Sequence, residues 1–274
     1  MIYSKEETGN FSAQSFAHLV VDEKDNILTI TLNRPEKKNA LNPVMINEIA
    51  YSLSYAHFNN DIWLVKIQSS GSVFCAGADL KSFSAAEEEP TVSTIPKPKS
   101  EVLIGELFTQ LHKPCIARVH AAVYAGGFLI ICGCTQVVAS EDATFCLPEV
   151  KRGLWPMQVM QSLLGIIPPR KALDLCMRGN TLSCREALDL GIVTTMAPAG
   201  RLDETVEALV QEIKANSPSA IRFGLKAYDE LRSISEQDKH KYLKKMLYEV
   251  LKTKDAGEGI AAFKEKRKPK WTGN

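Results

Sequence analysis

The chain has 274 residues, of which 45% are hydrophobic and 24% charged, an ordinary balance for one large globular domain or a domain with an appendage. The formal net charge of +1 gives no general electrostatic reason to bind nucleic acid or a membrane surface. No apolar run is long enough to span a bilayer, and residues 1–10 lack the apolar core of a secretory signal. We therefore expect a cytoplasmic protein with no nucleic-acid or membrane partner.

Seven cysteines, an odd number that lies mostly in apolar surroundings, favour reduced and buried thiols. The alternative interpretation is that Cys132, Cys134 and Cys146 bind a metal as a cluster. Their surroundings are strand-like, and no second pair or nearby histidine accompanies them. We predict inert packing and no metal site.

Strand-like and helix-like runs alternate in the first half of the chain, after a polar lead-in over residues 1–16 that we expect to be loose. Asn42 and Pro43 form a typical helix start. The expected elements are strands 17–22 and 27–32, helix 44–58, strand 63–67, helix 102–111, strand 115–119, the helix-like run 128–132 and strand 136–139. This alternation predicts an α/β fold with helices packed on sheets.

Residues 84–100 contain an acidic run and three prolines without periodicity. This predicts a mobile surface loop, with a domain linker as the alternative. After residue 149 we expect helices 156–164, 169–177 and 183–190, strand 192–195, helices 202–215, 218–232 and 236–251, and a short terminal piece over 260–263. The last helices are amphipathic without a core of their own, so they should pack on the main domain or on another subunit.

The central stretch contains two features of chemical interest. Gly126 and Gly127 directly precede an apolar run, where another backbone can approach and N–H groups can face a negative oxygen. Glu149 stands close to apolar neighbours, so it must find a partner or shift its pKa. The alternative for Glu149 is a salt bridge to Lys151 or Arg152.

Short motifs recur through nearly the whole chain, from about residue 18 to 271. They are Asn33-Arg34-Pro35, Asn39-Ala40-Leu41-Asn42, the segment 74–80, Lys113-Pro114, Ala125-Gly126-Gly127, Pro148-Glu149, Ala187 with Gly191, and the segment 263–269. Together they resemble the crotonase family, the enoyl-CoA hydratase/isomerase superfamily. The resemblance implies a crotonase-like spiral of ββα units over 17–200 and a C-terminal helical oligomerisation region over 201–274. It also implies homo-trimers or hexamers and acyl-CoA thioester substrates, with coenzyme A as part of the substrate and no other cofactor.

The resemblance also implies roles for individual residues. Ala78 and Gly126 match the two backbone N–H donors that stabilise a thioester enolate, each typically worth ~10²–10³ in rate, and Glu149 matches an acid/base. The alternative for the two glycine-rich segments is that both are only tight turns. Residues matching the segments that line the coenzyme A cleft are Lys38, Ala40, Ala76, Asp79 and Leu80.

A C-terminal pair, Phe263 and Lys266, matches residues that meet the adenine and a phosphate from a neighbouring subunit. An aromatic ring and an ammonium suit a nucleotide that carries a phosphate. The alternative for this lysine-rich end is a solvated basic tail or a weak polyanion patch.

The sequence departs from the family's hydratases at Leu129. They use two glutamates around a water, and the first lies three residues beyond the Gly126 position. Leucine cannot transfer a proton, whereas the family's isomerases work with the one glutamate that Glu149 matches. The bulky segment Leu154-Trp155-Pro156-Met157 also predicts a drier pocket.

We therefore expect an enoyl-CoA isomerase or a hydratase of limited efficiency. The alternatives are a decarboxylase that uses the same enolate chemistry and a non-catalytic acyl-CoA-binding or assembly subunit. An RNA-binding member is disfavoured by the balanced charge.

Overall fold

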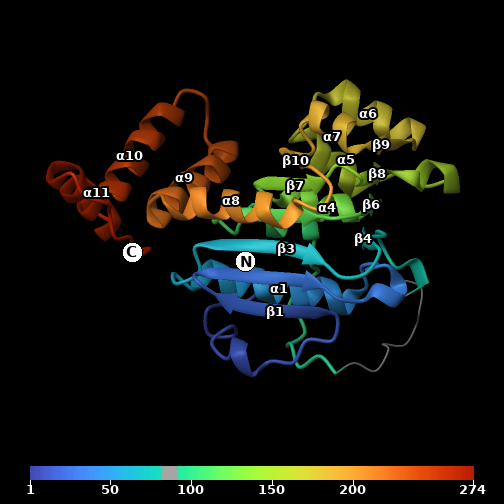
Figure 1. Ribbon diagram of the computed structural model, residues 1–274, viewed down its shortest axis with the longest axis horizontal. Coiled ribbons are helices and arrows are strands. Elements are labelled where there is room, and N and C mark those ends of the chain that lie inside the picture. The colour runs from blue at the N-terminus through green and yellow to red at the C-terminus, as the bar shows by residue number, and fades with distance from the viewer. Residues whose placement is uncertain (82–91) are drawn as a thin grey trace.

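The computed structural model describes residues 1–81 and 92–274, whose strands form two sheets (Figure 1). The larger sheet has six strands in the order β1-β2-β3-β5-β7-β10, and the smaller has four in the order β4-β6-β8-β9. All neighbouring strands are parallel except the pairs β1–β2 and β8–β9. The strands are β1 Leu19–Lys24, β2 Ile27–Leu32, β3 Leu64–Ser69, β4 Val73–Cys75, β5 Cys115–Val119, β6 Ala122–Tyr124, β7 Gln136–Ser140, β8 Thr144–Cys146, β9 Thr181–Ser183 and β10 Thr195–Ala197.

The chain crosses from the larger to the smaller sheet in three successive passes. β3 leads into β4, β5 into β6 and β7 into β8, and a helical segment follows each pair. This repetition is the predicted spiral of ββα units, which confirms the expected α/β class. The second strand of each pair was not predicted, because a run of three residues shows no period.

Helices cover the strands. They are α1 Pro43–Phe58, α3 Ile104–Leu107, α4 Gly127–Gly133, α5 Met157–Leu164, α6 Pro169–Arg178, α7 Cys184–Leu190, α8 Leu202–Lys214, α9 Pro218–Glu230, α10 Lys239–Leu251 and α11 Lys254–Glu265. Short 3₁₀ turns are Phe11–Ala13, Pro35–Lys37, Pro148–Arg152 and Leu231–Ser233. The helix predicted over 102–111 shortens to α3, the terminal piece lengthens to α11, and the last strand begins three residues later than expected.

The first long helix, α1, is fixed at both its start and its middle. Asn42 caps it, since its side-chain oxygen accepts from Met45 N at 2.9 Å. Glu48 is fully buried in the same helix, and its carboxylate accepts the N–H groups of Ala17 at 2.6 Å and His18 at 3.0 Å. Those bonds satisfy the buried charge and fix the chain just before β1.

The N-terminal segment packs on α1, so the prediction of a loose lead-in over 1–16 is wrong. Phe11 is buried and stacks on Tyr55 with ring centroids 3.9 Å apart. Tyr3 is buried against Tyr51, and its hydroxyl donates to the Pro96 carbonyl at 2.6 Å. Aromatic burial of this kind outweighs the cost of ordering the polar residues between.

The loop predicted over 84–100 divides in two. Residues 84–91 lie outside the described residues. The remainder packs on the protein, with Ile95 buried and Thr94 Oγ1 accepting from Ser15 N at 2.8 Å.

The C-terminal helices begin on the larger sheet and leave it. Apolar residues of α8, namely Leu202, Val206 and Val210, pack on Leu64, Ile116 and Val138 of the sheet. Figure 1 shows α9 to α11 extending beyond the sheet at one end. The expected packing of this region on the main domain is confirmed for α8, whereas the division at residue 201 stays a prediction. Among the described helices, none is long and apolar enough to cross a membrane.

Candidate active site

Three predicted site residues follow three neighbouring strands of the smaller sheet. Ala78 comes three residues after β4, Gly126 two residues after β6 and Glu149 three residues after β8. β4, β6 and β8 are adjacent and parallel, so their carboxyl ends meet at one edge of the sheet. That edge is where open parallel sheets place their functional loops.

The direction of the Ala78 N–H is set by its neighbours. Ala78 forms a parallel bridge with Leu41, in which Leu41 N donates to the Gly77 carbonyl and Asp79 N donates to the Leu41 carbonyl, both at 2.8 Å. The Gly77 carbonyl and the Ala78 N–H belong to one peptide unit, and in a trans peptide they point in opposite directions. The Ala78 N–H therefore points away from Leu41.

Gly126 is the N-cap of α4. The Ala125 carbonyl, in the same peptide unit as the Gly126 N–H, accepts from Phe128 N at 3.0 Å inside the first turn. The Gly126 N–H consequently faces out of the helix start, where the helix end carries partial positive charge.

The two loops touch at Gly77. This residue has φ +90°, and a methyl group on it would lie 2.5 Å from Ala125 Cβ and 3.0 Å from Gly126 N. A methyl group on Gly126 would lie 3.4 Å from Ala78 N. Glycine at position 77 therefore allows two outward-facing N–H groups to approach each other, an arrangement suited to binding one negative oxygen.

Glu149 stands in the 3₁₀ turn after β8 without an obvious partner. Its Oε2 atom is buried, and among the described residues it has no hydrogen-bond partner. Burial raises the pKa of Glu149 above its usual range, and contacts with its own backbone N–H and the charge of Arg152 offset this only in part. The described ion pairs include none to Lys151 or Arg152, so the salt-bridge alternative gains no support.

Leu129 lies in α4 and is 7% exposed, within the main hydrophobic core. Its Cδ2 would stand 3.8 Å from a methyl group on Gly105 of α3. The surroundings of this position are therefore apolar, as its side chain is.

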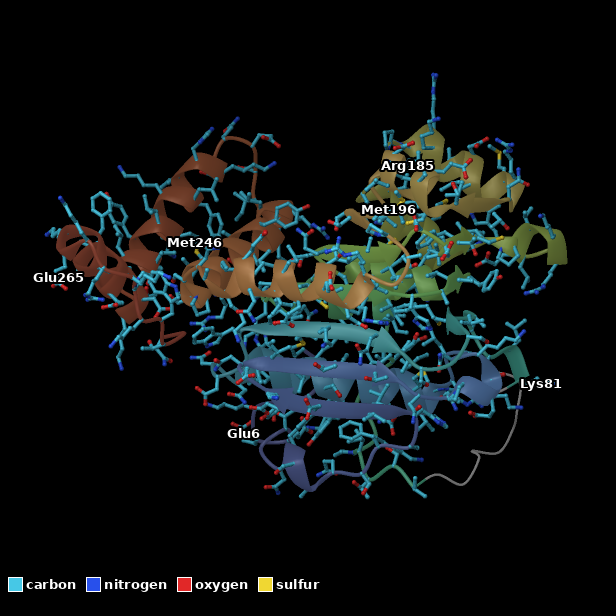
Figure 2. All side chains as sticks on the ribbon, viewed as in Figure 1. Glu6, Lys81, Arg185, Met196, Met246 and Glu265 are labelled. Atoms are coloured by element: carbon cyan, nitrogen blue, oxygen red, sulfur yellow. The ribbon has the colours of Figure 1, made fainter. Side chains whose placement is uncertain are left out.

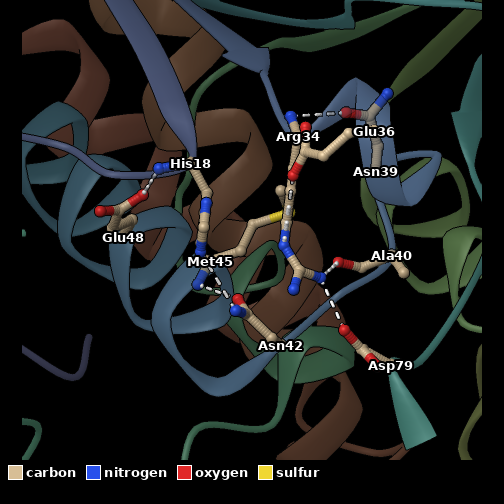
Figure 3. Close-up of polar contacts among 9 residues, drawn as sticks. All are labelled: His18, Arg34, Glu36, Asn39, Ala40, Asn42, Met45, Glu48 and Asp79. Atoms are coloured by element: carbon tan, nitrogen blue, oxygen red, sulfur yellow. Dashed lines mark hydrogen bonds and ion pairs between the residues drawn. The ribbon is translucent and has the colours of Figure 1, made fainter. Parts of the chain in front are cut away.

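The predicted coenzyme A segments form a rim beside Ala78. Lys38 is exposed, and its backbone carbonyl accepts a hydrogen bond from Ala76 N at 3.0 Å. Leu80 is 58% exposed. Ala40 and Asp79 both contact the buried guanidinium of Arg34 (Figure 3). Sequence reasoning gave Arg34 no role, and the ion pair with Asp79 spans 45 residues, so no local pattern could reveal it.

The C-terminal pair lies elsewhere in the same chain. Phe263 is 86% exposed on α11, and Lys266 ends that helix with φ +53°. Figure 2 shows Glu265 of α11 at one end of the molecule and Lys81, beside the Ala78 loop, at the other. Phe263 and Lys266 are thus not brought to the Ala78 loop within one chain, and their predicted cross-subunit role stays a prediction.

The cysteines considered for a metal cluster have separate partners. Cys134 Sγ lies 3.3 Å from Cys115 Sγ, whereas Cys146 Sγ donates to the Gly179 carbonyl at 3.5 Å. Across residues 1–81 and 92–274, no group of three or more His, Cys, Asp or Glu side chains could hold a metal ion.

The spiral α/β fold brings two outward-facing backbone N–H groups and the half-buried Glu149 to one sheet edge, an arrangement typical of an enzyme active site. The chain belongs to the enoyl-CoA hydratase/isomerase family, whose model matches residues 22–274. It is therefore an acyl-CoA enzyme of that family.

Individual relatives cover nearly the whole chain. A probable mitochondrial enoyl-CoA hydratase of Dictyostelium discoideum is 28% identical over 98% of this chain and 96% of its own length. A mevalonyl-coenzyme A hydratase of Aspergillus fumigatus is 30% identical over 90% of this chain and 91% of its own length. The crystal structure of an enoyl-CoA hydratase from Mycobacterium tuberculosis superposes with a TM-score of 0.82 and 31% identity, covering 94% of this chain and all of that one.

Proposed function

We propose that the protein moves the double bond of a 3-enoyl-CoA thioester to the 2-position, with Glu149 as its single acid/base and the N–H groups of Ala78 and Gly126 as its oxyanion hole. The observation that carries this proposal is the buried Oε2 of Glu149, which has no partner among the described residues. A carboxylate with a raised pKa is a stronger base, which suits removal of a weakly acidic C–H proton.

The reaction needs one proton carrier. The Glu149 carboxylate removes a proton from C2, and the electron pair moves through the C1–C2 bond to the thioester oxygen. The N–H groups of Ala78 and Gly126 donate to that oxygen and stabilise the dienolate. The protonated Glu149 then delivers its proton to C4, the C2–C3 double bond forms, and the carbonyl is restored.

Hydration of a 2-enoyl-CoA is the second candidate, and the names of the relatives favour it. Water addition requires one group to deprotonate the water and an acid to protonate C2. The buried Leu129 supplies neither, so Glu149 would have to serve both steps or a second group would have to come from elsewhere. This is why isomerisation ranks first.

We also propose that coenzyme A lies along the rim formed by Lys38, Ala40, Ala76, Asp79 and Leu80. Phe263 and Lys266 would reach the nucleotide from a neighbouring subunit of a trimer or hexamer. Their exposure on a helix remote from their own Ala78 loop supports a role across subunits. A cytoplasmic location likewise stays a prediction, and the Dictyostelium relative is described as mitochondrial.

The test compares matched 3-enoyl-, 2-enoyl- and malonyl-type CoA thioesters of one chain length, with absorbance of the conjugated thioester as the readout. We expect turnover of the 3-enoyl thioester to exceed that of the others. Faster hydration of the 2-enoyl thioester would favour the second candidate, and carbon dioxide release would favour a decarboxylase. Tight binding of every thioester without turnover would identify a non-catalytic binding subunit.

A further inference from the structure

Arg34 occupies an unusual place for a charged side chain. Its side chain is 5% exposed, and burying a guanidinium is unfavourable unless it is paired and hydrogen bonded. Its Nη1 donates to Asp79 Oδ2 at 2.7 Å and to the Ala40 carbonyl at 3.3 Å, and its backbone N–H donates to Asn39 Oδ1 at 2.9 Å (Figure 3). The turn that begins at Arg34 is thus tied to the Asp79 segment by a charged group.

The exposed Glu36 also lies near the guanidinium, with its Oε1 4.0 Å from Arg34 Nε. The two hydrogen-bond partners of the guanidinium, Ala40 and Asp79, stand on either side of the bridge that orients the first oxyanion donor. Ala40 precedes Leu41, and Asp79 follows Ala78. Leu41 hydrogen bonds to the peptide units on both sides of Ala78, so the guanidinium joins the two bridged segments one residue from the bridge. Removing it would loosen the 77–79 segment at the point where the direction of the Ala78 N–H is set, and oxyanion stabilisation depends on that direction.

The charge of Arg34 matters as well. Asp79 directly follows Ala78 in the chain, and a carboxylate in this segment opposes the binding of a negative oxygen at the Ala78 N–H. The Arg34 guanidinium neutralises this carboxylate through a direct ion pair. The oxyanion site consequently keeps the positive potential of its N–H groups.

We infer that Arg34 is a positioning residue of the oxyanion hole, which fixes the Ala78 N–H through Ala40 and Asp79 and cancels the negative charge beside it. This inference rests on the proposed function, because it adds a positioning residue to the same oxyanion site. A purely structural ion pair would affect folding alone, and the experiment must separate these two roles.

The probe is an arylacryloyl-CoA thioester, whose absorption band moves to longer wavelength when N–H groups polarise its carbonyl. In Arg34→Met we expect this shift to shrink and kcat to fall about 10²–10³-fold, as for the loss of an oxyanion donor. Arg34→Lys should recover part of both effects, because lysine keeps the positive charge beside Asp79 but lacks the planar guanidinium whose Nη1 contacts both Asp79 and Ala40.

A double variant isolates the charge. Arg34→Met combined with Asp79→Asn should regain part of the kcat that Arg34→Met loses, since the carboxylate that lost the Arg34 guanidinium is then also removed. The matched control is Arg118→Met, which removes an ion pair to Asp203 of α8 at 2.5 Å on the larger sheet. This control should keep the wild-type band shift and kcat.

Each outcome bears on the inference. A folded Arg34→Met protein with the wild-type band shift and kcat would overturn it, even if its melting temperature fell. If that variant does not fold, Arg34→Lys and Asp79→Asn carry the same test, and unchanged shifts in both would overturn it equally. A wild type that produces neither a band shift nor turnover would refute the proposed function itself, and this inference with it.

Discussion

Gly77 is the contact point of the two loops that carry the proposed donors, so one added methyl group tests their arrangement. Gly77 has φ +90°, and the Cβ of alanine there would lie 2.5 Å from Ala125 Cβ. The left-handed backbone costs about 1–3 kcal/mol for a residue with a side chain. The overlap adds about 1–3 kcal/mol. We expect Gly77→Ala to lower the free energy of unfolding by about 2–6 kcal/mol.

A matched control separates these two contributions. Gly200, in the turn between β10 and α8, has φ +75°, and a methyl group on it would meet nothing within 4 Å. Gly200→Ala therefore carries the backbone cost without the overlap, about 1–3 kcal/mol. Urea unfolding of the two variants gives the overlap contribution as their difference.

The overlap should also lower the catalytic rate, because relieving it moves Gly77 away from Ala125 and Gly126. Displacing one donor predicts a fall in kcat of ~10²–10³ for Gly77→Ala, whereas Gly200→Ala should keep its kcat. Rates are measured on folded protein with a 3-enoyl-CoA thioester, and affinity by calorimetry with a non-reactive acyl-CoA. If the two variants unfold alike and Gly77→Ala keeps wild-type kcat, the proposed contact does not set the donors.

Glu149→Gln should lower kcat by at least ~10²-fold, since a positioned acid/base contributes ~10²–10⁴. Its affinity for acyl-CoA should stay near wild type, and equal turnover by both proteins would contradict the role. Because proton abstraction needs the carboxylate, kcat/KM should rise with pH through the pKa of Glu149, which burial places above the usual range of a glutamate; a rate that is flat across that range would argue against Glu149 as the base. Leu129→Glu should raise the ratio of the hydration rate to the isomerisation rate, measured on folded protein. A wild type that already hydrates a 2-enoyl-CoA with a kcat of ~1–10³ s⁻¹ would refute the claim that Leu129 limits hydration. Light scattering should show a trimer or hexamer, and a stable, active monomer would remove Phe263 and Lys266 from the site.

Local sequence patterns indicated some of the candidate site residues. The glycine pair at Gly126 and the carboxylate at Glu149 stand out beside apolar runs, and the structure brings both to the edge of one sheet, although their roles stay predictions. The long periodic helices, such as α1 and α8, were also predicted to within a few residues. Local signals of this kind survive because the backbone itself enforces them.

Other parts depend on contacts between segments distant in sequence. β4, β6 and β8 have three residues each, too few to show a period, although they place Ala78, Gly126 and Glu149. Phe11 stacks on Tyr55, which is 44 positions away in the sequence, and no local pattern in the polar N-terminal segment indicates that contact. The ion pair of Arg34 with Asp79 is equally non-local.

The position of Glu149 illustrates how function can oppose stability in this fold. Burial raises its pKa, so the folded protein binds its proton more tightly than the unfolded chain does. Near neutral pH the carboxylate form therefore disfavours folding, and this penalty disappears as pH falls through the folded pKa. A group kept only for structure would gain from a partner. A base that must reach a C–H proton needs a free oxygen, and the unpartnered Oε2 among the described residues fits the second requirement.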